Sequence, residues 1–204
     1  MADYDRKDTF HQQAKREGYR SRAAYKLREI QRRSGILKPG ARVVDLGCWP
    51  GGWLQIAAGV VGARGRVVGI DLAELESPIE HGNVFALIGD LENPADLQRV
   101  REELGGAADV LLSDAAPKLT GIKAADRARA EGLLEGIERA LPALLRPGGD
   151  LLVKVLESPE ARTVSDRIGK SFESRKTIVP KATRKGSSER YLLARRWRGP
   201  ADLR

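Results

Sequence analysis

The chain contains a glycine-rich turn, Asp45-Leu-Gly-Cys-Trp-Pro-Gly-Gly-Trp53, directly after an apolar run, and turns of this kind bind nucleotide-type cofactors. A dinucleotide fingerprint needs a glycine at its middle position to admit a pyrophosphate, but Trp49 stands there between Gly47 and Gly52. Asp71 ends the next apolar run, where an acidic residue commonly binds a ribose. The pattern favours a phosphate-free nucleoside, S-adenosylmethionine, over a nicotinamide or flavin. An ordinary strand-turn-helix connection is the alternative.

Lys154 interrupts the apolar run Leu151-Leu-Val-Lys-Val-Leu156, which is typical of a central strand covered on both faces. Burial favours the neutral form of a lysine, and a neutral lysine can serve as a general base. A lysine near the strand end that reaches water is the other interpretation. Asp114 ends another apolar run. Because parallel strands present their carboxyl ends at one edge of a sheet, we expect Asp114 to lie near Lys154 and the aspartates of the first two runs.

Two further residues have a functional and a structural interpretation. Asp90 follows the third apolar run, where it could bind an adenine amino group or simply form a turn. Trp53 could cover the cofactor, although a tryptophan just inside a helix more commonly fills the core.

The elements that must position these residues form a regular alternation. Apolar runs alternate with segments long enough for helices, which predicts an α/β fold with a mainly parallel, doubly wound sheet. A helix is expected over residues 126–145, with Pro142 kinking or ending it, and Arg146-Pro-Gly-Gly149 as the turn into the last run. The runs are 42–46, 66–70, 84–88, 109–113 and 150–156.

The two ends of the chain differ from this body. Ser21 is expected to cap a helix that reaches residue 34 and stops at Gly35. The segments around Thr177 and Tyr191 are expected to form two antiparallel strands without a helix between them, closing the sheet at its edge. The first twenty and last six residues resemble loose ends.

Composition limits the class of protein. The 204 residues suit one domain, residues 1–204. One cysteine excludes an internal disulfide, and two histidines leave little for a zinc site. The sequence lacks a signal-peptide pattern and an apolar run of membrane-spanning length. We therefore expect a cytoplasmic monomer without a metal.

Positive charge is concentrated at the two ends. Residues 1–40 carry eleven Lys and Arg against five Asp and Glu, and residues 175–198 carry nine against one, whereas residues 41–174 carry fifteen against twenty-one. Basic clusters that flank an acidic body indicate a polyanionic partner, and RNA is the expected one. Solvated basic tails are the alternative. The contacts are expected in segments 15–38 and 175–198.

Together these motifs resemble the FtsJ/RrmJ family of RNA ribose 2′-O-methyltransferases, from about Tyr19 to Tyr191. The resemblance implies a Rossmann-like class I methyltransferase fold with seven strands, an antiparallel C-terminal strand pair and helices on both faces. The motifs are Ser21-Arg-Ala-Ala-Tyr-Lys-Leu27, Asp45-Leu-Gly, Pro50-Gly-Gly-Trp53, Ser113-Asp with Ala116-Pro117 and Gly121, Pro147-Gly-Gly149, Val153-Lys-Val155 and Ser188-Glu-Arg-Tyr191.

The resemblance also assigns roles to residues. The family's catalytic lysine, aspartate, lysine and glutamate fall on Lys26, Asp114, Lys154 and Glu189. Lys154 is expected to remove the proton of a ribose 2′-hydroxyl, while Lys26 and Glu189 position the ribose. With the residues of the glycine-rich turn, the expected cofactor-binding set is Asp45, Gly47, Gly51, Gly52, Trp53, Asp71, Asp90, Leu91 and Asp114.

Three stretches depart from the family pattern. The family usually has two small residues where this chain has Cys48-Trp49, and an asparagine where it has Lys118. The stretch Leu156-Glu-Ser-Pro159 also differs, so the acceptor-side loop is the part to which the resemblance extends least.

The resemblance implies S-adenosylmethionine-dependent methylation of RNA, with a uridine of 23S ribosomal RNA in the large subunit as the expected target. Two alternatives stay open: a transfer RNA methyltransferase of the same family, and a non-catalytic RNA-binding ribosome-assembly factor. A small-molecule or protein methyltransferase on the same fold is a further possibility. The expected organisation is a basic leader 1–20, an N-terminal helix with RNA-facing basic residues 21–40, a catalytic core 41–198 and a tail 199–204.

Overall fold

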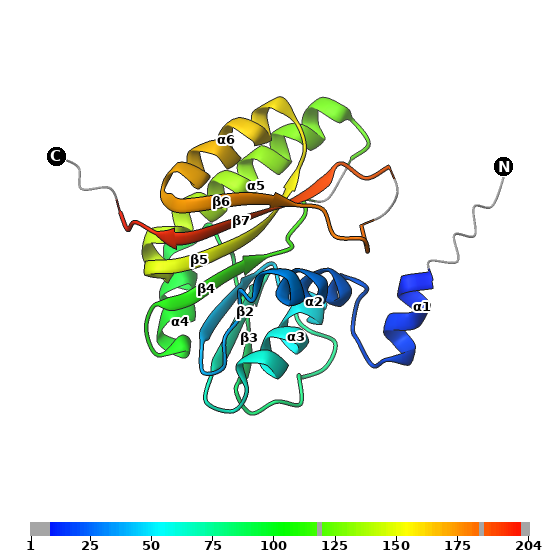
Figure 1. Cartoon of the computed structure of the whole chain (residues 1–204), viewed down its shortest axis with the longest axis vertical. Helices are drawn as coiled ribbons and strands as arrows, with labels where there is room; N and C mark the ends of the chain where they lie inside the picture. Colours follow the sequence, from blue (N-terminus) through cyan, green and yellow to red (C-terminus); the bar gives the residue numbers. More distant parts are fainter. Residues whose placement is uncertain (1–8, 118–119, 184–185, 201–204) are drawn as a thin grey trace.

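A computed structural model describes residues 9–117, 120–183 and 186–200. Seven strands form one sheet in the order β3-β2-β1-β4-β5-β7-β6 (Figure 1). Strand β7 runs antiparallel to both of its neighbours, and the other strands are parallel to one another. The strands are β1 Arg42–Leu46, β2 Arg66–Asp71, β3 Val84–Ile88, β4 Ala108–Ser113, β5 Leu145–Leu156, β6 Phe172–Ile178 and β7 Glu189–Trp197.

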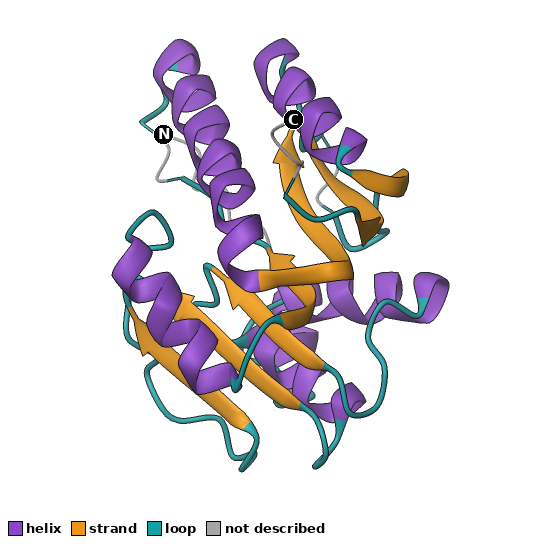
Figure 2. Cartoon of the chain, turned by 90° about the vertical axis from the view of Figure 1, so that its left-hand side faces the viewer, coloured by secondary structure: helices purple, strands orange, loops and turns teal. Residues whose placement is uncertain are grey.

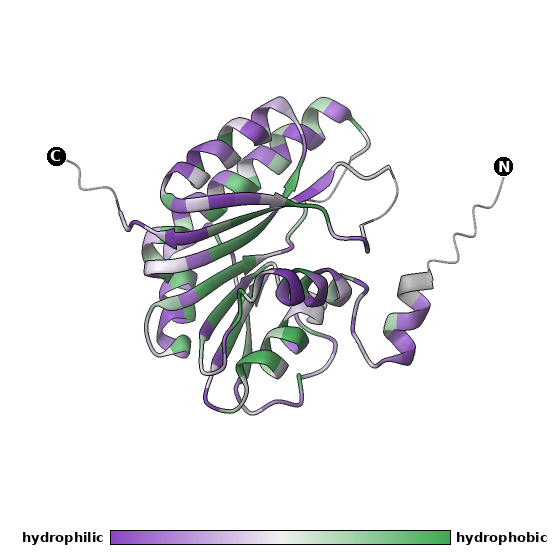
Figure 3. Cartoon of the chain, viewed as in Figure 1, coloured by the Kyte–Doolittle hydropathy of each residue, from purple (hydrophilic) through white to green (hydrophobic). Residues whose placement is uncertain are grey.

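Helices cover both faces of the sheet, as the sequence predicts (Figures 1 and 2). One apolar core lies between the sheet and α2 and α3, and a second lies between the sheet and α4, α5 and α6. Figure 3 shows apolar residues concentrated along the central strands, whereas polar and apolar residues alternate along helices such as α5 and α6. The helices are α1 Thr9–Arg16, α2 Ala23–Ser34, α3 Gly52–Val61, α4 Pro94–Leu104, α5 Lys123–Leu144 and α6 Pro159–Lys170.

Helix α2 ends as the sequence predicts, but it does not begin as predicted. Gly35 adopts a left-handed conformation, φ 57°, and its N–H donates to the Gln31 carbonyl, which closes the helix. The Ser21 hydroxyl is buried without a hydrogen-bond partner among the described residues, so the predicted cap is wrong. Its Oγ instead faces Gly52 at the start of α3, where a Cβ would collide with it. The Ser21 side chain therefore packs against the start of α3 instead of capping α2.

The predicted loose leader contains structure. Residues 9–16 form α1, which lies beside α2 (Figure 1). Ala14 is buried with Tyr25 of α2 and Ala182 of the segment between β6 and β7. These are long-range contacts, and an eight-residue helix has too little local stability to be identified from sequence.

Helix α5 leads directly into β5. Pro142 lies in the last turn of the helix, which ends at Leu144. The predicted turn at 146–149 is instead part of β5, which pairs with β4 at Leu145 and again from Asp150, with an irregularity between them. The carboxyl ends of β1, β2, β4 and β5 thus meet at one edge of the sheet, where the candidate residues lie.

Candidate active site

Four charged side chains predicted as catalytic form one cluster at this edge. Lys26 Nζ lies 2.7 and 2.9 Å from the two carboxylate oxygens of Glu189, and 3.9 Å from Asp114 Oδ2. Lys154 Nζ lies 3.2 Å from Asp114 Oδ1 and also donates to the Asp114 carbonyl. All four side chains are at most 15% exposed. The cluster contains two cations and two anions, so it can hold its own geometry without a ligand.

Strand pairing accounts for how such distant residues meet. In the antiparallel β5–β7 ladder, Lys154 is opposite Tyr191 and Leu156 is opposite Glu189. Asp114 directly follows β4, which is paired with β5 on its other side. Lys26 comes from α2, which packs over the sheet at this point.

Tyr191 belongs to the cluster, although the sequence assigned it no role. Its hydroxyl lies 2.6 Å from Asp114 Oδ1 and 3.1 Å from Glu189 Oε1, and its ring is fully buried. Burial, together with the nearby charges of Asp114 and Glu189, raises the pKa of Tyr191 well above its ordinary value of 10. The phenol therefore stays protonated and donates a hydrogen bond to the carboxylates. The signal available in the sequence was its place at the end of the Ser188-Glu-Arg-Tyr191 motif.

Glu189 stays ionised in this environment. Burial by itself would raise its pKa, but the charges of Lys26 and Lys154 and the hydrogen bonds from Lys26 and Tyr191 lower the pKa below its ordinary value. The carboxylate therefore keeps Lys26 in place across the neutral range.

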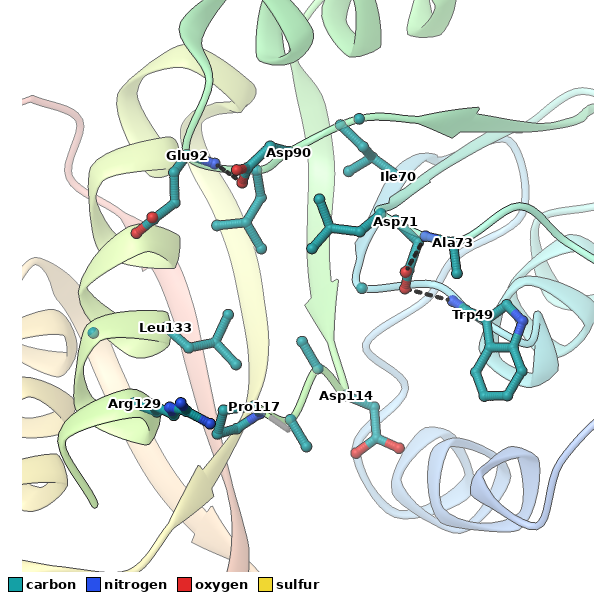
Figure 4. A pocket seen from close by; sticks show the side chains of 17 residues that line it. Trp49, Ile70, Asp71, Ala73, Asp90, Glu92, Asp114, Pro117, Arg129 and Leu133 are labelled. Atoms are coloured by element: carbon teal, nitrogen blue, oxygen red, sulfur yellow. Dashed lines mark hydrogen bonds between the residues drawn. The ribbon is translucent and has the colours of Figure 1, made fainter. Parts of the chain in front are cut away.

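A pocket of about 720 Å³ opens next to the cluster and shares Asp114 with it (Figure 4). Asp71 at the end of β2 and Asp90 after β3 supply carboxylates, while Leu91, Pro117 and Leu133 supply apolar surface. The pocket is further lined by Gly47, Trp49, Ile70, Leu72, Ala73, Gly89, Glu92, Ala115, Ala116, Arg129 and Gly132.

The glycine-rich turn places Asp71 at the pocket wall. Asp71 Oδ2 accepts a hydrogen bond from the Trp49 N–H, and Oδ1 accepts one from the Ala73 N–H, each at 2.9 Å. The Trp49 indole is 49% exposed and lies at the pocket edge opposite Leu133 (Figure 4). Trp49 therefore contributes its backbone to the carboxylate and its ring to the rim.

Asp45, at the carboxyl-terminal part of β1, is buried and unpaired. It is 1% exposed, and neither carboxylate oxygen has a hydrogen-bond partner among the described residues. Burial, and then repulsion by Asp114 and Asp71, raises the pKa of Asp45 well above its ordinary value. An unpartnered buried carboxyl group is costly, and a hydrogen-bond donor would relieve that cost. Asp45 is, however, absent from the pocket lining, so it lies behind the residues that face the pocket.

The remaining predicted cofactor residues divide between pocket and core. Gly47 lines the pocket, and a Cβ there would collide with Ala115, so only glycine lets the turn pass this close. Gly51 and Gly52 lie beside Arg20 and Ser21 and are absent from the pocket lining.

Trp53 also lies outside the pocket lining. It is 3% exposed, its Nε1 donates to the Ala23 carbonyl, and its ring contacts Tyr191 at a centroid distance of 5.8 Å. The structure thus places Trp53 in the core, the more common position for such a tryptophan.

The departures from the family pattern have different outcomes. Cys48 is buried next to Gly69. Ser158 caps α6 by accepting a hydrogen bond from the Ala161 N–H, so the stretch after Lys154 forms an ordered strand-to-helix connection. Lys118 lies outside the described residues.

The two basic segments lie side by side. Arg22 donates to the Ala182 carbonyl, and the Lys181 N–H donates to Glu29 Oε2, which joins α2 to the segment between β6 and β7. Part of their charge is neutralised by acidic partners. These ion pairs are Arg28–Glu17, Arg33–Glu29, Arg175–Asp166, Arg190–Glu157, Arg195–Asp150 and Arg196–Glu173.

Among the described residues, no three His, Cys, Asp or Glu side chains come together as possible metal ligands. No helix within residues 9–117, 120–183 and 186–200 combines the length and apolar character needed to cross a membrane.

Known proteins resemble this chain in sequence and in structure. The ribosomal RNA large subunit methyltransferase E of Rhodopseudomonas palustris (strain TIE-1) is 47% identical over 95% of this chain and 82% of its own length. The protein of the same name from Methanoculleus marisnigri is 42% identical over 96% of this chain and 94% of its own length.

Among solved structures, a ribosomal RNA methyltransferase from Plasmodium falciparum superposes with a TM-score of 0.75 at 26% identity, over 89% of this chain and all of its own. Aeropyrum pernix fibrillarin, determined with S-adenosyl-L-methionine bound, shares the fold with a TM-score of 0.62 at 19% identity, over 86% of this chain and 75% of its own. The family model described as FtsJ-like methyltransferase matches residues 19–197, and the chain belongs to this family.

Proposed function

We propose that this protein transfers a methyl group from S-adenosylmethionine to a ribose 2′-hydroxyl of large-subunit ribosomal RNA, with a uridine as the target. The observation that supports it best is that Asp114 belongs both to the pocket lining and to the ion-paired cluster. A donor in the pocket and an acceptor at the cluster would therefore share one boundary. Relatives with 42% and 47% identity are named as large-subunit ribosomal RNA methyltransferases.

The cofactor is S-adenosylmethionine, and the pocket residues fit it. We assign Asp71 to the ribose hydroxyls, Asp90 to the adenine amino group, and Leu91 and Leu133 to the faces of the adenine ring. We also assign Asp45, which has no partner among the described residues but is absent from the pocket lining, to the methionine end of the cofactor. When bound, S-adenosylmethionine supplies an electrophilic methyl group on a cationic sulfur.

We assign proton removal to Lys154 rather than to Lys26. A ribose hydroxyl is barely ionised at neutral pH, so the site must accept its proton as the new carbon–oxygen bond forms. Lys26 is held by both carboxylate oxygens of Glu189, whereas Lys154 contacts one carboxylate oxygen and the carbonyl oxygen of Asp114. The two carboxylate contacts fix the position of Lys26, which suits it to orient the acceptor oxygen. For this step Lys154 must first release its own proton, and its amine then takes the proton of the hydroxyl.

The acceptor is assigned from charge. The basic segments 15–38 and 175–198 adjoin each other through Arg22 and Lys181, and both adjoin the cluster through Lys26 and Glu189. RNA phosphates bind to such a surface through Coulomb attraction and counterion release. A monomeric state and a cytoplasmic location are proposed on the sequence alone.

Label transfer from radioactive S-adenosylmethionine tests this function. The acceptors are large ribosomal subunits from cells lacking the protein, free 23S ribosomal RNA, transfer RNA and a protein mixture. Label is expected in the ribosomal RNA and at a nucleotide linkage that resists alkali, because a 2′-O-methyl group blocks cleavage by the neighbouring hydroxyl. Label in transfer RNA or protein, or alkali-labile linkages, would contradict the assignment. RNA binding without label would indicate an assembly factor.

A further inference from the structure

The guanidinium of Arg20 joins three separate segments of the chain. Its Nη2 donates to Ser77 Oγ at 2.9 Å and to the Pro78 carbonyl at 2.6 Å, and its Nη1 donates to the Pro50 carbonyl at 3.5 Å. Arg20 lies just before α2, Pro50 lies in the glycine-rich turn, and the other two acceptors lie in the loop between β2 and β3, residues 72–83. One half-buried side chain therefore links the leader to both segments.

The 72–83 loop depends on this link. The loop contains no helix or strand, and within the described chain the hydrogen bonds that join residues 74–80 to another segment come from Arg20. Apolar contacts of Leu75 and Ile79 with the α2–α3 core complete the attachment. A Cβ at Gly51 would lie 3.0 Å from Arg20 Cδ and 3.2 Å from Ile79 Cδ1, so both side chains pack directly over the glycine.

The first residues of the loop belong to the cofactor pocket. Leu72 and Ala73 line it, and the Ala73 N–H donates to Asp71, the residue assigned to the ribose. A loop that is free to move from residue 74 onward would loosen this end as well. Arg20 itself is absent from the pocket lining, so its effect on the cofactor is indirect.

The base of the link is firmly held. The Arg20 N–H donates to Gln55 Oε1 at 2.9 Å, and Gln55 Nε2 donates to the Gly18 carbonyl at 3.0 Å. Gln55 is in α3, which packs against the sheet. The guanidinium is thus presented to the loop from a rigid helix.

We propose that Arg20 is a positioning residue that keeps the 72–83 loop against the cofactor pocket. The inference rests on the proposed function only in taking S-adenosylmethionine as the ligand. Loss of the guanidinium should weaken cofactor binding and leave the chemical step intact, because Arg20 contacts neither the cluster nor the pocket interior.

Calorimetric titration with S-adenosylhomocysteine tests the proposal without RNA or turnover. Arg20→Ala is expected to raise the Kd about tenfold, as for the loss of hydrogen bonds from a charged donor. Arg20→Lys keeps the charge but not the three-point contact and should recover part of the affinity. Arg64→Ala, which removes an exposed arginine near β2, is the matched control and should bind like the wild type.

Two further readouts separate positioning from general damage. In Arg20→Ala, KM for S-adenosylmethionine should rise while kcat at saturating cofactor stays close to wild type. Amide hydrogen exchange should become faster in the 72–83 loop and stay unchanged in β4 and β5.

The results that would overturn the role of Arg20 differ from those that would overturn the proposed function. A Kd for Arg20→Ala within twofold of wild type would overturn the inference, even if RNA is methylated normally. A different result would overturn the proposed acceptor instead: the wild type binds the cofactor, Arg20→Ala binds it more weakly, and no RNA becomes labelled. If Arg20→Ala does not fold, Ser77→Ala decides, because it removes one acceptor on the loop: a rise of about threefold is expected, and an unchanged Kd contradicts the role.

Discussion

The donor pocket and the ion-paired cluster touch at Asp114, yet they are built in different ways. The pocket takes Asp71 and Asp90 from the ends of two consecutive strands, and Asp45, which is outside the pocket lining, has no hydrogen-bond partner among the described residues. The cluster draws its members from residues 26 to 189 and balances two lysines against two carboxylates. The pocket lining thus carries more acidic than basic side chains, which suits a cationic ligand. In the cluster, the charges of the two lysines and the two carboxylates balance one another.

Replacement of Lys154 by alanine should give the largest difference between the two regions, with a large loss of methyl-transfer rate and little change in cofactor binding. If Lys154 is the base, the single-turnover rate of methyl transfer should fall about 10²- to 10⁴-fold. The Kd for S-adenosylhomocysteine should change little, because Lys154 does not line the donor pocket. Lys170→Ala, an exposed lysine at the end of α6, is the control. A near-wild-type rate for Lys154→Ala would remove the base assignment.

The second-largest difference should appear when the salt concentration is raised, because RNA binding should weaken much more than cofactor binding. If the basic segments neutralise three to four phosphates, RNA affinity should fall about 30-fold between roughly 50 and 200 mM monovalent salt. The affinity for S-adenosylhomocysteine, which has no net charge to steer, should fall by less than about twofold. Filter binding for RNA and calorimetry for the cofactor measure the two slopes. Equal slopes would indicate that the basic surface does not bind the acceptor.

Asp71→Asn should act on the donor side alone. The amide retains one oxygen acceptor, so one of the hydrogen bonds from Trp49 and Ala73 is lost together with the charge. We expect the Kd for S-adenosylhomocysteine to rise about tenfold, with kcat at saturating cofactor almost unchanged. Asp166→Asn, on the exposed surface of α6, is the matched control. A fall in kcat with unchanged affinity for S-adenosylhomocysteine would show that Asp71 acts on the chemical step rather than on cofactor binding.

Asp45→Asn should have the smallest effect of these changes, and it should make the cofactor-free protein more stable. It is expected to increase the free energy of unfolding of the cofactor-free protein by about 1 kcal/mol at pH 7, because an amide avoids the burial of a charge. The pKa of Asp45 is raised in the folded state, so wild-type stability is lost as pH rises above about 3.8 through that raised value.

The gain from Asp45→Asn should therefore grow from pH 4 to pH 8, as measured by denaturant unfolding at each pH. Cofactor affinity should fall in the same variant. A variant that is less stable than wild type at pH 8 would show that Asp45 already has a favourable partner.

Much of the fold followed from local patterns. The five apolar runs coincide closely with β1 to β4 and with the second half of β5, which begins at Leu145. Asp71, Asp90, Asp114 and Lys154 lie at or beside the strand ends where alternation placed them. The order of a doubly wound sheet then brings these ends to one edge. The antiparallel pair β6–β7 was also visible, although β6 begins earlier than predicted.

Other features depended on contacts between distant residues. Ser21 packs against Gly52 rather than capping α2, Trp53 entered the core, and α1 forms against Tyr25 and Ala182. No local pattern distinguishes these outcomes, because each is decided by the partner that packing supplies.

The sequence by itself determined where most strands lie along the chain, the acidic residues of the donor side and the identity of the charged groups, since these depend on periodicity, residue type and spacing. Only the tertiary structure decided which groups are paired. It left Asp45 without a partner, placed Tyr191 between Asp114 and Glu189, and joined Arg20 to Ser77. The physical reason is that hydrogen bonds and ion pairs act over a few ångströms, and only the folded chain brings residues more than fifty positions apart within that range.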